Sequence, residues 1–525
     1  MLLLVALVAV ALAALYWWST SKFDYWSRRG VKFPRPAPLL GNYGAYLLQR
    51  RNLGEVTRAI CRQFPDEPLV GAFYGPHPVA IVQDPALLKL ITTKDFYYFN
   101  GREVSEHTHK EITTKNMFFN SGDKWRVLRQ NLTPLFSSAK MKNMFHLIEK
   151  CARDFEVLLE EEAKKSEIVE ARTLMSRFTM DGIGACGFGI DSGVMQNDAK
   201  NNPFAEVGEM IFEESKWRTF LTAFRAIFPS MFYGLRFSLF PDAINSFFHS
   251  VLMSVFKERK WEPSSRQDFV DMVIGLKKNK YITGDSMRNM KGGSDKLQIE
   301  VDDDFLVAQC VLFFAAGFET SSTASSFTLY ELARHPEHQQ RVIDEVDAYL
   351  ATRGEVRYDC TTELPFLDQC VEEGLRLHTT ILTREVAEDY TLPSGVKLDK
   401  GLRVHIPLFH IQRNPKYFED PDEFKPERFS PEERKKIVPY THFPFGEGPR
   451  ACIGMRFARM QMMAGLVTVF KSYRIELAPS MPREPQYCAG TMVVRIKGGI
   501  QLRLIPRENG QRNSRYSNPT KFLWS

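Results

Sequence analysis

The stretch that decides the fold is FPFGEGPRACIGMRF, residues 443–457, where one cysteine stands among several glycines. A zinc site would need a second cysteine or a histidine two to four residues from Cys452, and neither is present. A lone cysteine is usually a small buried apolar side chain. The residues around it have the spacing Phe445-x-x-Gly448-x-Arg450-x-Cys452-x-Gly454. Something other than protein side chains is therefore predicted to complete the coordination at Cys452.

Composition indicates a large globular protein and limits the class of partner. The chain has 525 residues, 44% hydrophobic and 25% charged, close to an average soluble domain. Its 40 phenylalanines predict a large apolar interior or cavity. The net charge of +6 is not gathered into a basic run with interleaved aromatics, so nucleic-acid binding has little support. The eight cysteines form no CxxC pair, which favours reduced thiols in a cytosolic compartment.

The first residues form an apolar segment. MLLLVALVAVALAALYWW, residues 1–18, contains no charged side chain. As a helix it would span about 26 Å, against roughly 30 Å for the hydrocarbon core of a bilayer. Lysines and arginines follow between residues 22 and 35, which predicts that the C-terminal side lies in the cytosol. A cleaved signal peptide is the alternative, but the basic start that such peptides have is missing. We expect residues 1–20 to form a transmembrane anchor.

The rest of the chain is expected to form one large unit. Residues 21–38 are basic and proline-rich and are predicted to be a stiff spacer. Residues 39–507 contain no second linker, so one mainly α domain with small β-sheets is expected. The polar segment 277–296 is predicted to be an exposed loop, and residues 508–525 a polar tail. Strand-like pieces lie near residues 68–83, 383–407 and 490–505.

A long helix is predicted to cross this domain. It begins at Asp302 or Asp303 as a cap and ends before Pro336. Its first half is apolar on nearly all sides and should be buried. Gly317 and a group of serines and threonines follow in the middle, where the backbone hydrogen bonds are expected to bulge. A regular packed helix, with hydroxyls bonding back to backbone carbonyls, is the alternative.

The pattern around Cys452 resembles the haem-binding signature of the cytochrome P450 superfamily. The resemblance implies that family's fold, a single haem domain behind an N-terminal anchor helix. It makes the Cys452 thiolate the ligand of the iron in haem b. Trp125 and Arg129 of WRVLR, Arg384 of LTRE and Arg450 would meet haem propionates. The predicted haem-contacting residues are Trp125, Arg129, Ala316, Arg384, Phe445, Arg450, Cys452 and Gly454.

Two further motifs fit the same family. Glu373 and Arg376 of EGLR lie one helical turn apart, and Arg428 of PERF would complete a buried structural network with them. AGFET, residues 316–320, resembles the family's oxygen-activating pattern. The resemblance assigns hydrogen bonding at the reacting oxygen to Thr320 and proton delivery to Glu319.

Phenylalanines recur between residues 212 and 256, which by family position forms the roof helices. Aromatic faces there suit lipophilic substrates. The expected substrate-pocket residues are Phe118, Phe119, Phe313, Phe314 and Thr380. The match is closest to microsomal insect detoxification enzymes. It departs from them at Ala451, where asparagine is usual, and at residues 378–380, where Tyr-Pro-Pro is common.

No dinucleotide or flavin motif is evident, so the electrons must come from another protein. The resemblance implies NADPH-cytochrome P450 reductase, with cytochrome b5 as a second donor, at the cytosolic face of the endoplasmic reticulum membrane. The candidate docking cations are Lys124, Arg126, Lys140 and Lys142.

The expected activity is that of a haem monooxygenase, which inserts one atom of dioxygen into a lipophilic small molecule. A peroxide-rearranging enzyme of the same fold is a rival, disfavoured by the Glu319–Thr320 pair. A haem-based carrier without turnover is a second rival, and a helical scaffold without cofactor is a third. The sequence leaves the substrate open.

Overall fold

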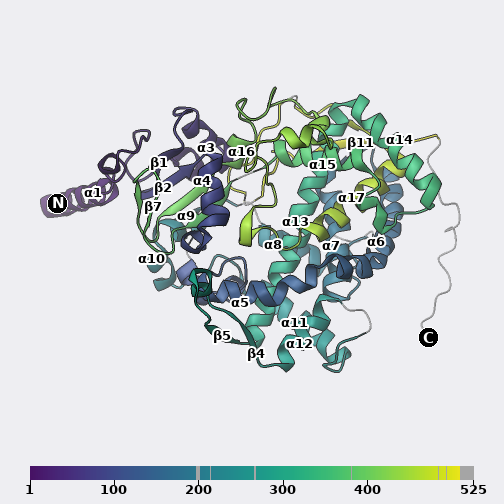
Figure 1. The fold of residues 1–525 in the computed structure, drawn as a ribbon, viewed down its shortest axis with the longest axis horizontal. Helices are drawn as coiled ribbons and strands as arrows, with labels where there is room; N and C mark the ends of the chain where they lie inside the picture. Colours follow the sequence, from purple (N-terminus) through teal and green to yellow (C-terminus); the bar gives the residue numbers. More distant parts are fainter. Residues whose placement is uncertain are drawn as a thin grey trace.

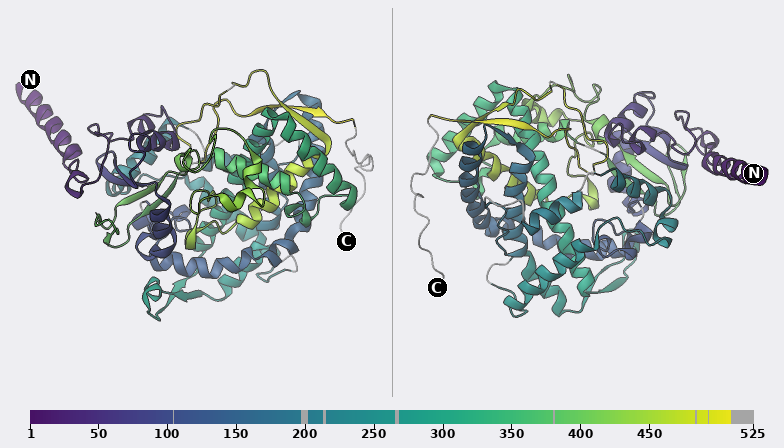
Figure 2. Two further views of the ribbon diagram at one scale, coloured as in Figure 1. Left: turned by 45° about the horizontal axis from the view of Figure 1, so that its top comes forward. Right: turned by 180° about the vertical axis from the view of Figure 1, so that it is seen from behind.

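The computed structural model describes residues 1–103, 105–196, 202–212, 215–264, 268–379, 381–482, 484–491 and 493–508. The predicted polar tail lies outside these residues except for Glu508. Helix α1 (Leu2–Thr20) projects from the body, and its apolar side chains are exposed (Figures 1 and 2).

The body is mainly helical with small sheets, which confirms the predicted fold class. Most of the longer helices build the helical part. They are α5 (Gly122–Leu132), α6 (Ser138–Lys165), α7 (Ala171–Ile183), α8 (Pro203–Phe212), α9 (Lys216–Ile227), α10 (Pro229–Gly234), α11 (Asp242–Glu258), α12 (Phe269–Lys278), α13 (Asp303–Arg334), α14 (Pro336–Arg353), α15 (Pro365–Leu377) and α17 (Met455–Ser472). Four further helices lie beside the sheet of β1, β2, β9 and β6, which is described below. They are α2 (Gly44–Leu47), α3 (Leu53–Cys61), α4 (Pro85–Lys89) and α16 (Leu408–Ile411).

Four small sheets complete the fold. The largest has the order β1–β2–β9–β6, with β2 and β9 parallel and the other pairs antiparallel. Its strands are β1 (Leu69–Tyr74), β2 (His77–Val82), β6 (Leu382–Glu385) and β9 (Arg403–Ile406). A second sheet contains β3 (Ile168–Glu170), β10 (Tyr473–Leu477) and β11 (Gln501–Pro506). A third pairs β4 (Tyr281–Asp285) with β5 (Lys296–Glu300), and a fourth pairs β7 (Tyr390–Thr391) with β8 (Lys397–Leu398).

Helix α13 passes through the middle of the helical body (Figure 1). Asp302 caps it by accepting a hydrogen bond from the Phe305 amide at 2.7 Å. The expected bulge is absent, since the helix stays α from Asp303 to Arg334. The hydroxyls of Thr320, Ser326 and Thr328 bond back to backbone carbonyls one turn earlier, which is the alternative that the sequence left open. Gly317 lets α7 approach closely, because a Cβ there would lie 2.9 Å from the Ile183 side chain.

Two expectations about connecting segments need correction. The polar segment 277–296 is a loop only in part, because it also contains the end of α12, the whole of β4 and the first residue of β5. Ile282 and Gly284 face inward at alternate positions of β4, and polar side chains occupy the remaining positions. The Gln130 side chain of α5 holds the hairpin by accepting a hydrogen bond from the Asp285 amide at 2.8 Å. So short a hairpin needs few apolar residues, and for this reason the sequence did not reveal it.

The segment 21–38, expected to be a stiff spacer, packs on the main sheet instead of standing apart from the domain. Trp26 is fully buried against the main sheet, and its indole N–H donates to the Ala72 carbonyl at 3.0 Å. Gly71 makes room for the ring, because a Cβ there would lie 2.4 Å from the indole. The Gly71 amide also bonds to the Lys32 carbonyl. The chain after α1 is therefore held on the sheet by packing and backbone hydrogen bonds.

Candidate active site

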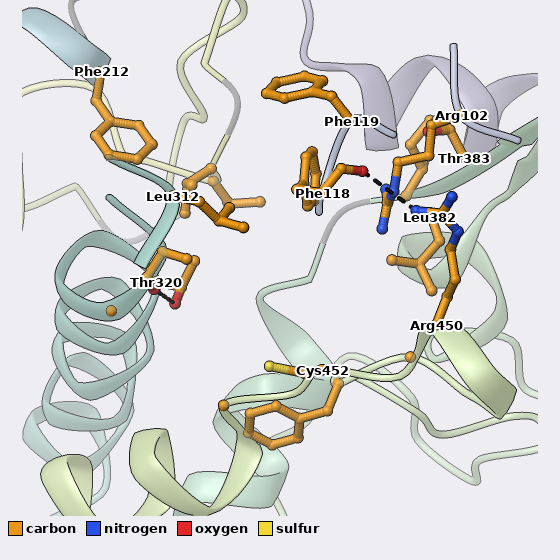
Figure 3. Close-up of a pocket in the computed structure, with 18 of the residues that line it drawn as sticks. Arg102, Phe118, Phe119, Phe212, Leu312, Thr320, Leu382, Thr383, Arg450 and Cys452 are labelled. Atoms are coloured by element: carbon orange, nitrogen blue, oxygen red, sulfur yellow. Dashed lines mark hydrogen bonds between the residues drawn. The ribbon is translucent and has the colours of Figure 1, made fainter. Parts of the chain in front are cut away.

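A cavity of about 670 Å³ lies between α13 and the loop that carries Cys452. All eight residues predicted to contact a haem line this cavity. Figure 3 shows Cys452 on one wall, Thr320 on α13 facing it across the open space, and Arg102 and Arg450 to one side. Four separate parts of the chain, α5, α13, β6 and the loop before α17, thus contribute to one site.

The loop before α17 presents the Cys452 sulfur to the cavity. The Cys452 amide donates to the Phe445 carbonyl at 2.7 Å and closes the loop. Gly448 has a φ of +71°, and a Cβ there would collide with the Thr92 carbonyl, so only glycine fits. A Cβ on Gly454 would meet nothing within 4 Å, which leaves space beside the sulfur for a flat ligand. One side of the loop thus packs closely against the protein, and the other side borders the cavity.

The Cys452 side chain is exposed to the cavity although it lies deep within the molecule. Burial raises the pKa of the thiol. A backbone hydrogen bond from Gly454 and the positive charge of Arg129 act in the opposite direction. A thiol in this position can be held as a thiolate by a metal ion, because metal coordination deprotonates it.

Four arginines surround one side of the cavity: Arg102, Arg129, Arg384 and Arg450. Burial lowers the pKa of Arg102 to about 9 and that of Arg384 to about 10, and it also lowers the pKa of Arg450. Repulsion by Arg102, Arg384 and Arg129 lowers the pKa of Arg450 further. The Nε atoms of Arg102, Arg384 and Arg450 have no hydrogen-bond partner among the described residues. Buried cations without matching acids fit a ligand that brings its own negative charges.

These observations fit a haem. Its iron would take Cys452 as a ligand, its flat ring would occupy the space beside Gly454, and its propionates would satisfy the arginines. Trp125 belongs to the same wall, because the Arg450 guanidinium lies 4.7 Å from the centre of its ring.

Thr320 and Glu319 face different surroundings. Thr320 lines the cavity and donates to the Ala316 carbonyl at 2.7 Å. Glu319 is fully buried and is not among the described residues that line the cavity. Its carboxylate pairs with Arg172 of α7 at 3.1 Å and with Arg495 at 2.8 Å. Successive residues on a helix point about 100° apart, so one member of the pair faces the cavity and the other faces the ion pairs.

Glu373, Arg376 and Arg428 lie together. Arg376 donates to Glu373 through Nε at 2.6 Å and Nη2 at 2.8 Å, and both side chains are fully buried. Arg428 Nε reaches the same carboxylate at 3.3 Å. The remaining Arg376 donors bond to the backbone carbonyls of Gln412, Pro421 and Glu423. The network joins α15 to the chain that leads into the cysteine loop.

The predicted pocket phenylalanines divide into two groups. Phe118, Phe119 and Phe313 line the cavity. The expectation for Phe314 is wrong, because its ring is fully buried among other aromatic rings, 5.1 Å from Phe248 and 5.2 Å from Phe318. Its neighbour Phe313 occupies the cavity side of α13. Thr380 lies outside the described residues.

Most roof phenylalanines also point elsewhere. Of the phenylalanines between residues 212 and 256, only Phe212 and Phe240 belong to the described lining of the cavity. Phe220 and Phe224 stack on each other on the opposite side of α9. Phe248 and Phe256 are buried in the core. Periodicity showed that this segment is helical and aromatic but could not show which face of each helix meets the cavity.

The sequence interpretation missed several charged residues of the site, among them Arg102, Arg172 and Arg495. Arg102 follows Gly101, which pairs with Glu385 in an isolated bridge, and this pairing brings Arg102 beside Arg384. Arg172 and Arg495 are 147 and 176 residues from Glu319, their shared partner. No local spacing signals contacts of this kind.

Comparison with known proteins agrees with this geometry. The family model described as Cytochrome P450 matches residues 31–504. Cytochrome P450 6B6 of Helicoverpa armigera is 33% identical over 507 residues, which cover 96% of this chain and 98% of the relative. Probable cytochrome P450 6a14 of Drosophila melanogaster is 32% identical over 514 residues, with 96% and 99% covered. Cytochrome P450 6k1 of Blattella germanica is 31% identical over 507 residues, with 95% and 96% covered. With a family match over nearly the whole chain and a cysteine set in an arginine-rimmed cavity, this protein belongs to the cytochrome P450 family of haem-thiolate monooxygenases.

Proposed function

We propose that this monooxygenase oxidises lipophilic small molecules such as xenobiotics, plant allelochemicals or insecticides, with electrons supplied from NADPH through a membrane-bound reductase. The observation that carries the proposal is the position of Cys452, whose sulfur opens into a large and mostly apolar cavity opposite Thr320. The similarity to insect relatives supports the substrate class.

The proposal assigns haem b to the cavity, where Cys452 would hold its iron and the arginine cluster would hold its propionates. When bound, haem would supply the oxidising chemistry. Phe118, Phe119 and Phe313 would exclude water and hold an apolar substrate near the reacting centre. Glu373, Arg376 and Arg428 would keep the cysteine loop in place.

Proton delivery is proposed to depend on Glu319 and Thr320. The Thr320 hydroxyl can donate a hydrogen bond into the cavity if it leaves the Ala316 carbonyl. When one of its ion pairs, with Arg172 or with Arg495, opens, the Glu319 carboxylate can take up a proton from water and then pass it toward Thr320. Acid and alcohol therefore act in sequence.

The proposed reductase surface contains Lys124 and Lys142, both exposed. Arg126 is weaker support, because it lies 3.8 Å from Asp285 of the β4–β5 hairpin. Lys140 is half-buried beside a smaller second cavity. Charge reversal at Lys124 and Lys142 together should lower reductase-supported turnover in a salt-dependent manner. Cytochrome b5 is a further candidate for the same surface.

Localisation at the endoplasmic reticulum membrane is supported by α1, which has a mean hydropathy of 2.2 and is almost wholly exposed. The basic residues that follow it favour a cytosolic catalytic domain.

The decisive experiment is the carbon monoxide difference spectrum of the dithionite-reduced protein, in wild type and in Cys452→His. A strongly red-shifted Soret band in wild type, lost in the variant, is expected. A wild-type protein that binds haem without this band would contradict thiolate ligation by Cys452. Turnover of apolar compounds with reductase and NADPH then separates an oxygenase from a haem carrier, which would bind ligands and oxidise none.

A further inference from the structure

A second cavity, of about 320 Å³, lies beside the main one and is lined by residues of α6, α7, α12, α13 and α17. Protein interiors are close-packed and hold few voids larger than a water molecule, so a space of this size is an exception. A dry apolar cavity of about 150 Å³ is already enough to bind benzene or xenon. The second cavity therefore has room for a molecule with one aromatic ring.

Most side chains around the second cavity are apolar. They include Phe136, Phe269, Phe313, Phe457, Met141 and Met144. Methionine side chains are unbranched and polarizable, so they adapt to the shape of a ligand and make favourable contacts with aromatic rings. Water would find few hydrogen-bond partners in such surroundings, which favours an apolar occupant.

The two acids of the lining are already bound within the protein. Arg259 pairs with Asp268 through Nη2 at 2.6 Å and with Asp271 through Nη1 at 2.5 Å. Asp271 also accepts hydrogen bonds from the amide and the hydroxyl of Ser264, at 2.6 and 2.9 Å. A cationic ligand would have to displace these partners. Since the described lining holds two acids and one lysine, Lys140, an anionic ligand is disfavoured as well. The occupant is therefore expected to be neutral.

Two phenylalanines belong to both cavities. Phe136 and Phe313 line the main cavity and the second one, and their ring centres lie 5.3 Å apart. Phe313 also packs against Phe269 of the second cavity, with ring centres 4.3 Å apart. A molecule in the second cavity would contact these rings on one side, and a substrate in the main cavity would contact them on the other. Sites that share a wall in this way are expected to influence each other's affinity.

We propose that the second cavity binds a neutral apolar molecule with one aromatic ring, and that this molecule changes the affinity of the main cavity through Phe136 and Phe313. The phenylalanines of the lining allow the edge-to-face or offset packing that aromatic rings prefer. Binding in the second cavity is independent of the proposed function, whereas the effect on the main cavity rests on it. The protein would then respond to a second small molecule while a substrate is bound.

The test uses fluorobenzene as the probe. The full-length haem-loaded protein is first given an excess of clotrimazole, a bulky azole, to fill the main cavity. Binding of fluorobenzene is then measured by equilibrium dialysis, with correction for partition into detergent. Wild type should bind about one fluorobenzene per protein under these conditions. Met144→Trp should abolish this binding, because the larger indole would occupy the second cavity.

Met290→Trp is the matched control, since it makes the same exchange at a position that is 39% exposed between β4 and β5. It should bind fluorobenzene as wild type does. Absence of binding by wild type would overturn the inference, as would equal binding by wild type and Met144→Trp. If Met144→Trp fails to fold, Cys186→Leu narrows the cavity from another wall, and unchanged binding in that variant would overturn the inference too.

The effect on the main cavity is measured by titrating clotrimazole, followed by the Soret shift, with and without fluorobenzene. Direct competition in the main cavity is the loss of clotrimazole affinity that remains in Met144→Trp. Wild type should lose about fivefold more affinity than this variant. Phe313→Leu should reduce the additional loss, because it removes the shared ring. Equal losses in wild type and Met144→Trp would overturn the effect on the main cavity.

These outcomes are separable from the test of the proposed function. A protein that shows the red-shifted carbon monoxide band but binds no fluorobenzene in the second cavity would support the proposed function and refute the second site. A protein without the band would refute the proposed function, and the difference in fluorobenzene binding between wild type and Met144→Trp would still decide on the second site.

Discussion

Thr320 opens onto the cavity, whereas the carboxylate of the adjacent Glu319 lies between the guanidinium groups of Arg172 and Arg495. The ion pairs therefore hold the Glu319 carboxylate away from the cavity that Thr320 faces. Arg172 also pairs with Glu209, whose side chain is 67% exposed, so these charges form a path from the surface to the site. We infer that opening of an ion pair precedes proton delivery.

Glu319→Gln should lower product formation by about a hundredfold, because the variant keeps the shape of the side chain and removes its acid. The solvent deuterium isotope effect on turnover should rise in the same variant. The measurement is product per unit time with reductase and NADPH in H₂O and in D₂O. Glu209→Gln, at the exposed end of the path, is the control and should change turnover by less than about twofold. If Glu319→Gln formed product as fast as wild type, the role of Glu319 would be purely structural.

Arg376→Met should destabilise the protein by roughly 3–5 kcal/mol, because it leaves the fully buried carboxylate of Glu373 without its main partner. Urea unfolding of the haem-loaded protein measures the effect, and retention of haem on a desalting column is a second measurement. Arg353→Met breaks an ion pair with Glu363 in which both side chains are 38% exposed, and it should lower the free energy of unfolding far less than Arg376→Met does. Similar losses in the two variants would argue against the buried network.

How much the sequence could predict depended on the distance between partners along the chain. The cysteine loop, the Asp302 cap and the Glu373–Arg376 contact join residues a few positions apart, so spacing alone located them. Arg102, Arg172 and Arg495 reach the site only through contacts between distant segments, and no local pattern marked them. Periodicity also failed at Phe314 and on α9, because it identifies the faces of a helix but not the neighbour of each face.

Arg102→Met should affect the haem-free and haem-loaded proteins in opposite directions. Without haem, the substitution removes a desolvated cation that is repelled by Arg384, and it should stabilise the protein by roughly 1 kcal/mol. With haem, it removes a partner of a propionate, so haem should dissociate faster. Thermal unfolding of both forms and transfer of haem to apomyoglobin measure the two effects. Arg236→Met, at an exposed position, should change neither, and a loss of stability in both forms of Arg102→Met would contradict the assignment of Arg102 to an anionic ligand.

Trp26→Ala should lower the free energy of unfolding by roughly 3–5 kcal/mol, because the indole is fully buried and its N–H bonds to the sheet. Removal of residues 1–21 should leave the folded domain intact, whereas removal of residues 1–30 should carry the same loss as Trp26→Ala. Trp17→Ala is the matched control, since that ring is 72% exposed and should contribute less than about 0.5 kcal/mol. Urea unfolding in detergent compares the four proteins. If Trp26→Ala were as stable as Trp17→Ala, the segment after α1 would be a free spacer after all, and the orientation of the domain relative to α1 would not be fixed by the sheet.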